Sequence, residues 1–453
     1  MIRSKTFQAL VLILFVSVLL RGAVAIWLGN EVDAPPLLTD QRSYHALGVR
    51  LSTGHGFSFD RPWYPFYLPA GSPTAHWSYL YSFFVALVYT IFGPQVVAAR
   101  LVQAILGGIL LPLAVYQLTR RTLGSPASAQ LLTGLRERGL NTEALPVVAA
   151  GVAAIYFYFV LYAATLMTET FFITALLWSL DRAIALADTP TLKNGLALGA
   201  GLAAATLLRQ SVLPGIAVMV LWLLWAAWRA RRLRQALGAL AVSGAVLVVA
   251  IAPFTLRNYR VFGELLLLNS NAGYAMYSAQ HPMHGTSFQA FEAAPLPVDL
   301  PAGNEAQLDR ELMKRGIAFV LADPGRYLLL SLSRVPVYFE FWPSSDTSFI
   351  NNIGRVGSFG IFLPLMLYGM WLALRLSGPG VTKGGGQFFA GPVALLIGFM
   401  AFYSVLHIFT WAMPRYRLPV DAAALPFAAI ALNDLVCWVT VRRKGKLDAQ
   451  RSS

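Results

Sequence analysis

Long apolar runs recur along almost the whole sequence, and they constrain the fold more than any other feature. Runs of about 17 to 25 residues match the length of α-helix that crosses the hydrocarbon core of a bilayer. The chain is 57% hydrophobic and only 12% charged, whereas a soluble domain carries about twice that charge. The sequence therefore predicts an all-α polytopic membrane protein with about ten spans, at residues 7–28, 97–119, 146–164, 168–187, 192–208, 212–228, 235–256, 358–376, 388–410 and 418–440.

Basic residues separate the two sides of this predicted bundle. The net charge of +14 would suit a nucleic-acid ligand if the charges shared one surface. Instead, Lys and Arg cluster in loops between apolar runs and at the C-terminal end, which is the positive-inside pattern of membrane topology. We therefore expect no nucleic-acid partner, and we expect both ends of the chain, including a basic tail at 441–453, to be cytoplasmic. The clusters lie at 120–121, 136–138, 229–234 and 442–446.

One further apolar run, 77–93, conflicts with this pattern if it crosses the membrane. The basic clusters that follow it would then face outside. The run is rich in aromatic residues (Trp77, Tyr79, Tyr81 and Tyr89), which favour the boundary between lipid and water. We expect a helix that lies on or partly in the outer interface.

The chain then divides into membrane and outer segments. We expect a first transmembrane helix at 1–28, an outer loop with juxtamembrane helices at 29–96, a transmembrane core at 97–256, an outer loop at 257–357 and C-terminal transmembrane helices at 358–440. In the second outer loop, Asn304 with Gln307 predicts a capping box, and Asp323 before Pro324 predicts a second helix start. Two amphipathic helices on the outer membrane surface fit this pattern. We expect irregular structure at 278–303 and a flexible glycine loop at 384–386.

Asp40 stands past the first span and is the one carboxylate of the stretch LLTDQRSYHALGVR. An acid in this position can take a proton from a hydroxyl group presented at the membrane surface. The alternative is structural, because Thr39 or Asp40 can simply cap a helix over 41–53.

Two other ionisable residues interrupt apolar sequence. Glu169, in LMTETFF, can orient Asp40, hold a metal ion or bind a sugar hydroxyl, or else be an exposed loop carboxylate. Arg21 lies inside the first apolar run, where a charge needs a partner. It can neutralise a lipid phosphate, pair with Glu169 or extend to the outer interface.

Five arginines fall at the outer ends of predicted spans, against the positive-inside bias. Guanidinium groups bind phosphate through paired, charge-assisted hydrogen bonds. We expect these residues to form a phosphate site, with interfacial anchoring as the alternative: Arg100, Arg209, Arg257, Arg415 and Arg417. His45 and His76 with Asp40 match no strong metal-ligand spacing. We predict no metal site and no certain cofactor, while a divalent metal stays open.

Short motifs in a consistent order carry a family resemblance over nearly the whole chain. They are Asp40 with Tyr44 and GHGF, PTA at 73–75, ARLVQAILG at 99–107, TE at 168–169, LRQ at 208–210, RNYRVFGELLLLNSNAGY at 257–274, DP at 323–324 and RYRLP at 415–419. In these motifs the chain resembles the bacterial GT-C glycosyltransferases of the protein O-mannosyltransferase and aminoarabinose-transferase type.

The resemblance implies a GT-C-type helical bundle in the bacterial inner membrane, with an active site facing the periplasm. It implies a polyprenyl-phosphate sugar donor, a glycolipid, polysaccharide or protein acceptor, and Asp40 as the essential acid. On these motifs we expect Tyr44, His76, Asn271 and Tyr416 to bind substrate. Two departures stand out, since Gln41 replaces a second acid, and His76, Trp77 and Ser78 replace a Lys or Arg with Pro.

Two other classes of function compete with a hexosyl- or pentosyltransferase. A transporter or lipid flippase tends to place ionisable residues near the middle of the bilayer, whereas here they gather at the outer ends of spans. A GT-C homologue without activity, serving as an assembly factor, is the third possibility.

The topology is testable by labelling. The only cysteine is Cys437, so single cysteines can be introduced in a Cys437→Ser background. We expect labels in 120–145 and 229–234 to react only from the cytoplasmic side, and labels in 257–357 to react from outside, because of the basic clustering. Outside labelling of 229–234 would contradict the topology.

Overall fold

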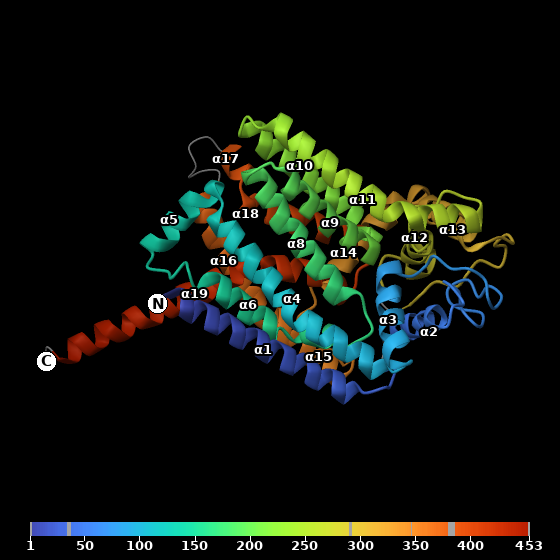
Figure 1. The fold of residues 1–453 in the computed structure, drawn as a ribbon, viewed down its shortest axis with the longest axis horizontal. Helices are drawn as coiled ribbons and strands as arrows, with labels where there is room; N and C mark the ends of the chain where they lie inside the picture. The colour runs from blue at the N-terminus through green and yellow to red at the C-terminus, as the bar shows by residue number, and fades with distance from the viewer. Residues whose placement is uncertain (1, 34–37, 290–291, 346, 379–385, 452–453) are drawn as a thin grey trace.

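The structure is a computed structural model that describes residues 2–33, 38–289, 292–345, 347–378 and 386–451. The described residues form helices and contain no β-strand, which confirms the all-α class. Both termini lie at one end of an elongated bundle, and the helices α2, α3, α12 and α13 gather at the other (Figure 1). The predicted glycine loop at 384–386 lies outside the described residues except for Gly386.

Eight helical segments in the described ranges are long and apolar enough to cross a membrane. A ninth span arises if α6 (Leu145–Ile155) and α7 (Phe157–Ala163), which meet at a bend of 59°, count as one. The remaining predicted span, at 192–208, corresponds to α9 (Leu192–Leu208), a shorter apolar helix of 17 residues. The eight segments are made mainly of α1 (Ile2–Leu28), α4 (Val96–Gly124), α8 (Glu169–Asp188), α10 (Leu213–Arg229), α11 (Leu233–Phe262), α16 (Ile361–Ser377), α18 (Pro392–Phe409) and α19 (Leu418–Arg451), of which the spans begin at Lys5 in α1 and end at Thr440 in α19.

The apolar run at 77–93 forms α3 (Tyr79–Phe92), which has only 14 residues. At a rise of about 1.5 Å per residue it is too short to cross a hydrocarbon core of about 30 Å. It packs instead against α2 (Asp40–Ser52). Gly48 allows this approach, because a Cβ atom there would lie 2.5 Å from a methyl group of Val85.

Two helix starts predicted from the sequence are confirmed. Asn304 and Gln307 form a complete capping box at the start of α13 (Glu305–Ala322). The Asp323 side chain accepts a hydrogen bond of 2.9 Å from the Arg326 N–H at the start of α14 (Pro324–Tyr338).

Several shorter elements did not follow from the sequence. Residues 278–280, which were expected to be irregular, are the end of α12 (Ala272–Gln280). The predicted span at 358–376 begins inside the π-helical turn η4 (Val356–Gly360), which continues into α16. The others are η1 (Pro126–Ser128), α5 (Ala129–Glu137), η2 (Gln210–Val212), η3 (Pro282–His284), α15 (Phe349–Arg355), α17 (Gly386–Phe389) and η5 (Pro414–Arg417).

Arg21 holds the bend between α6 and α7. Its fully buried guanidinium donates from Nη1 to the Ala154 carbonyl at 2.9 Å and from Nη2 to the Ala153 carbonyl at 3.0 Å. A helix that breaks inside a bundle leaves carbonyls that need donors. The expectations that Arg21 pairs with Glu169, meets a lipid phosphate or extends to the interface are therefore wrong.

Candidate functional site

Asp40 is the first residue of α2, and its carboxylate is paired with an arginine from the far end of the chain. Arg415 Nη1, on η5, donates to Asp40 Oδ2 at 2.8 Å. Thr39 occupies the N-cap position, but its side chain makes no capping hydrogen bond. Asp40 keeps 28% of its side chain exposed and Arg415 keeps 16%, so the pair lies at the edge of the bundle and within reach of a ligand.

Gln41 fixes the start of α2 from the buried side. Its Oε1 accepts from Arg100 Nη2 at 3.0 Å and from the Leu166 N–H at 3.0 Å. Arg100 also donates to the carbonyls of Leu28 and Gly29 at 3.0 and 2.8 Å. Arg100 therefore links α4 to the end of α1. Gln41, which stands where the family resemblance would place a second acid, anchors the start of α2 and with it Asp40.

Glu169 is the first residue of α8 and is 1% exposed, so the alternative of an exposed loop carboxylate is wrong. Its Oε1 accepts from Arg209 Nη2, and Arg209 Nε donates to Thr168 Oγ1 at 2.8 Å. The other carboxylate oxygen, Oε2, is buried and has no hydrogen-bond partner. A buried charged oxygen of this kind is costly unless a ligand satisfies it.

Tyr416 joins the two ion pairs. The guanidinium carbons of Arg415 and Arg209 lie 5.2 and 5.6 Å from the centre of its ring. Arg415 Nη2 donates to the Tyr416 hydroxyl at 3.4 Å. His407 stacks on the ring at 4.9 Å. Tyr416 thus forms a common wall between the Asp40 and Glu169 pairs.

Tyr44 and His76 border the same carboxylate. Burial raises the pKa of Tyr44, and the charge of Asp40 raises it further. Burial lowers the pKa of His76 to about 4, and Asp40 opposes that change, so His76 is neutral near pH 7. His76 Nδ1 is buried without a hydrogen-bond partner. Both side chains are thus buried near the Asp40 carboxylate.

Arg257 and Asn271 donate hydrogen bonds to the backbone of the loop between α2 and α3. Arg257 Nη1 donates to the Thr74 carbonyl at 2.8 Å, and its Nη2 donates to the Phe57 carbonyl at 3.2 Å. Asn271 Nδ2 donates to the His76 carbonyl at 3.4 Å. Arg257 thus holds the loop between α2 and α3, rather than lying against Asp40.

Arg417 is fully buried and locks η5 in place. Its Nε donates to Asp421 Oδ1 at 3.0 Å, and its Nη1 donates to the Tyr338 carbonyl at 2.6 Å. The Tyr156 hydroxyl donates to the other Asp421 oxygen at 2.7 Å. Of the five arginines predicted to bind phosphate, Arg415 pairs with Asp40 and Arg209 pairs with Glu169. The other three, Arg100, Arg257 and Arg417, donate to backbone carbonyls that hold the fold.

Sequence reasoning missed two acids that hold the outer segment. Glu305 Oε1 accepts from the Ala75 N–H at 2.6 Å and from the Ser270 hydroxyl. Asp309 accepts from the N–H groups of Gly273 and Tyr274 at 3.0 and 2.9 Å. Their spacing of four on one face of a predicted helix was the only available signal.

A metal site finds no support in the part of the chain that the structure describes. No three His, Cys, Asp or Glu side chains there lie close enough together to hold an ion.

No protein-family model and no curated protein matches the sequence. Among solved structures, the chain is similar to the archaeal oligosaccharyltransferase AglB from Archaeoglobus fulgidus in complex with an inhibitory peptide and a dolichol-phosphate. The TM-score is 0.55 at 15% identity, over 98% of this chain and 52% of that one. The apo form of the Archaeoglobus fulgidus enzyme gives 0.54 at 16% identity, over 97% and 52%. The chain has a GT-C-type fold.

The chain spans about half the length of these two structures. A further similarity, to ArnT from Cupriavidus metallidurans bound to undecaprenyl phosphate, has a TM-score of 0.43 at 16% identity, over 86% and 54%. The likeness to the two oligosaccharyltransferase structures establishes the fold, and the predicted GT-C-type architecture is confirmed.

Asp309 should make the outer segment sensitive to pH. Burial raises its pKa to about 7 from 3.8, although the Tyr274 and Gly273 N–H groups lower it. Between these values the folded state binds more protons than the unfolded state, so stability falls as pH rises. Asp309→Asn should reduce that fall. Part of the fall in stability should remain in that variant, because burial also raises the pKa of Glu305.

Hydrogen exchange of α12 and α13 between about pH 4 and 7 measures the effect. Asp299→Asn is the control, because Asp299 is exposed on the same segment and its hydrogen bond with Arg315 lowers its pKa. An equal pH dependence in the native protein and Asp309→Asn would contradict the assignment.

Proposed function

We propose that the chain is a glycosyltransferase that moves a sugar from a polyprenyl-phosphate donor to a hydroxyl acceptor at the outer face of the membrane. The observation that carries the proposal is the pairing of Asp40 with Arg415 beside the buried pair of Glu169 and Arg209. One half-exposed carboxylate, one half-buried guanidinium and one buried acid with a free oxygen supply a base, a phosphate ligand and a sugar ligand.

Asp40 is the proposed general base. It takes the proton of the acceptor hydroxyl as that oxygen bonds to the anomeric carbon of the donor sugar. The bond from the anomeric carbon to the phosphate oxygen breaks, and its electron pair leaves with the polyprenyl phosphate. The base and the leaving group lie on opposite sides of the sugar ring, so the configuration at the anomeric carbon inverts.

Arg415 is the proposed ligand of the donor phosphate. Its Nη1 donates to Asp40 Oδ2 at 2.8 Å, and its Nε is buried without a partner. A guanidinium binds phosphate with two parallel hydrogen bonds. As charge builds on the leaving oxygen, this contact strengthens and stabilises the transition state.

Buried polar atoms without partners mark the proposed sugar position. They are Glu169 Oε2 and His76 Nδ1. Native structures pair nearly all such atoms, and sugar hydroxyls can both donate to a carboxylate oxygen and bond to a neutral imidazole nitrogen. Tyr44 and Tyr416 would close the sides of this position.

The lipid part of the donor is proposed from the fold. The AglB structure, which shares the architecture over 98% of this chain, is a complex with a dolichol-phosphate. In this chain, the apolar helices around the site provide a surface for a similar isoprenoid chain. Release of polyprenyl phosphate from a lipid-linked sugar by purified protein tests this reaction against a transporter or flippase.

Asp40→Asn should remove transfer and preserve the fold. The amide has the size of the carboxylate but cannot accept a proton, so transfer should fall by about a hundredfold or more. The protein should stay folded, and donor binding should be kept or strengthened, because the donor phosphate no longer competes with a carboxylate for Arg415. Full activity in this variant would exclude Asp40 as the base, and Glu169→Gln would then be the next variant to assay.

Arg415→Ala should mainly weaken donor use. Loss of a charge-assisted contact of about 1.5–3 kcal/mol corresponds to about 10- to 100-fold in affinity. Arg42→Ala is the matched control, because Arg42 lies on α2 two residues from Asp40 and pairs with Asp33 in solvent. Steady-state kinetics with varied lipid donor separates the two variants. Equal kinetics would remove Arg415 from the phosphate site.

A further inference from the structure

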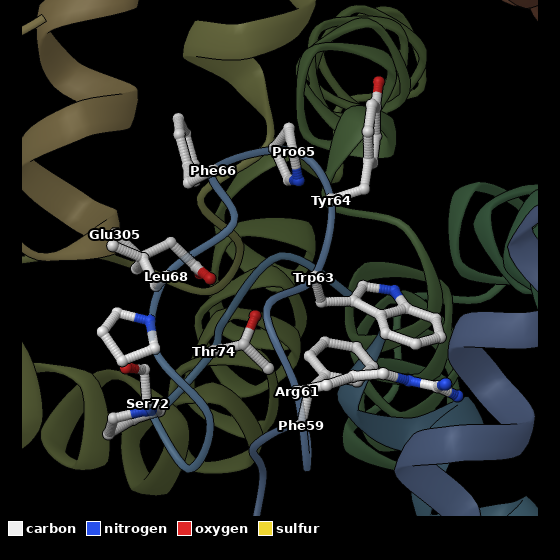
Figure 2. Close-up of a pocket in the computed structure, with 12 residues that line it drawn as sticks. Phe59, Arg61, Trp63, Tyr64, Pro65, Phe66, Leu68, Ser72, Thr74 and Glu305 are labelled. Atoms are coloured by element: carbon white, nitrogen blue, oxygen red, sulfur yellow. The ribbon is translucent and has the colours of Figure 1, made fainter.

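The small hollow inside the loop between α2 and α3 belongs to the packing of that loop (Figure 2). It has room for about one water molecule. The oxygens of Glu305 and Thr74 that face it are already used, because Glu305 accepts from the Ala75 N–H at 2.6 Å and Thr74 Oγ1 accepts from the His76 N–H at 3.1 Å. A ligand site leaves polar atoms for the ligand to bond, and one such atom lies on α7.

The bend between α6 and α7 gives α7 its direction. The two helices meet at 59°. On the α6 side, Arg21 binds the last carbonyls of the helix. On the α7 side, the Tyr158 N–H donates to Ser358 Oγ, on η4, at 2.9 Å. Because side chains from other helices bond to both sides of the bend, the path of α7 is specified by the tertiary structure.

The far end of α7 lies beside the start of α2. Gln103 Nε2, on α4, donates to the Tyr162 carbonyl at 3.0 Å. In the turn that follows, the Leu166 N–H donates to Gln41 Oε1 at 3.0 Å. Gln41 directly follows Asp40 in the sequence, so the last turn of α7 is fixed close to the proposed base.

Three tyrosines lie at and after the bend, and their hydroxyl groups differ. The Tyr156 hydroxyl donates to Asp421 Oδ2 at 2.7 Å, and the Tyr158 hydroxyl donates to the Asn351 carbonyl at 3.3 Å. Tyr162 is 7% exposed. Its hydroxyl has no hydrogen-bond partner within the described ranges, yet it is not sealed from solvent. Tyrosine hydroxyls in buried surroundings usually find a partner, so this one is available to a ligand.

Tyr162 lies near both ion pairs of the candidate site. Its hydroxyl is close enough to Arg415 and Glu169 to interact with their charges. Arg415 Nε is buried without a partner. Tyr162 and Arg415 therefore bring two unused donors into the same region, and phosphate oxygens accept hydrogen bonds from both kinds of group.

We propose that Tyr162 binds the donor phosphate, with its hydroxyl donating a hydrogen bond to a phosphate oxygen beside the Arg415 guanidinium. The inference rests on the proposed transferase function and adds a residue to its donor site. Arg415 must leave Asp40 to bind the phosphate, whereas Tyr162 gives up no partner in the described part of the chain. The phosphate gains negative charge as its bond to the sugar breaks, so this hydrogen bond strengthens in the transition state.

Binding of a lipid phosphate tests Tyr162 without any sugar transfer. The full chain in detergent micelles is mixed with undecaprenyl phosphate or with undecaprenol, which lacks the phosphate, and bound lipid is measured by native mass spectrometry. We expect the native protein to prefer the phosphate. Tyr162→Phe removes only the hydroxyl, so this preference should fall by about tenfold, the effect of losing one hydrogen bond to a charged group. Binding of undecaprenol should not change.

Tyr158→Phe is the matched control. Tyr158 lies one turn earlier on the same face of α7, with its ring centre 6.1 Å from that of Tyr162. Because its hydroxyl bonds to the protein, its loss should lower thermal stability and leave the phosphate preference unchanged. Tyr162→Phe should show the reverse. A purely structural role of Tyr162 would instead lower thermal stability or weaken the binding of both lipids alike.

The outcomes separate this inference from the proposed reaction. A phosphate preference that falls in Tyr162→Phe and is kept in Tyr158→Phe supports the assignment, even if no sugar is ever transferred. An unchanged preference in Tyr162→Phe overturns it and leaves the role of Arg415 intact, and equal weakening of both lipids overturns it as well. A native protein that does not prefer the phosphate overturns both proposals. With active enzyme, Tyr162→Phe should lower kcat/KM for the lipid donor and leave the KM for the acceptor unchanged.

Discussion

Four buried arginines hold the ends of helices together, and the rest of the structure depends on them. Each donates to backbone carbonyls where a helix stops or breaks: Arg21 at the end of α6, Arg100 at the end of α1, Arg334 at the end of α12 and Arg417 at the end of α14. All four are fully buried. A guanidinium has five donors in one plane, so one side chain can satisfy several carbonyls that no helix bond reaches.

This role explains which parts of the candidate site the sequence could predict. An arginine at the outer end of a span has the same sequence signature whether it binds a phosphate or a helix terminus. Arg100 and Arg415 both lie at the outer ends of predicted spans, against the positive-inside bias. Arg100 donates to the carbonyl of Leu28 at the end of α1, whereas Arg415 donates to Asp40. The choice is made by the tertiary partner, and a partner such as the Leu28 carbonyl carries no distinctive sequence pattern.

Features set by local sequence were predicted more completely. The spans follow from the length of apolar runs, and the starts of α13 and α14 follow from side chains that bond to the nearest free N–H groups. The bend between α6 and α7 was missed because its carbonyls are satisfied by Arg21, more than a hundred residues away in sequence. The burial of Glu169 was missed for the same reason, since its partner Arg209 belongs to another helix end.

The pairing of Asp40 with Arg415 couples the binding of a phosphate at Arg415 to the separation of the ion pair. A phosphate that binds Arg415 must compete with the carboxylate, so part of its binding free energy is used to separate the pair. Thermodynamic linkage requires the reverse effect to have the same size. Within the proposed mechanism, a donor phosphate that takes up Arg415 releases the Asp40 carboxylate from its partner. The acceptor hydroxyl would thus meet a free carboxylate only while the leaving group is in place.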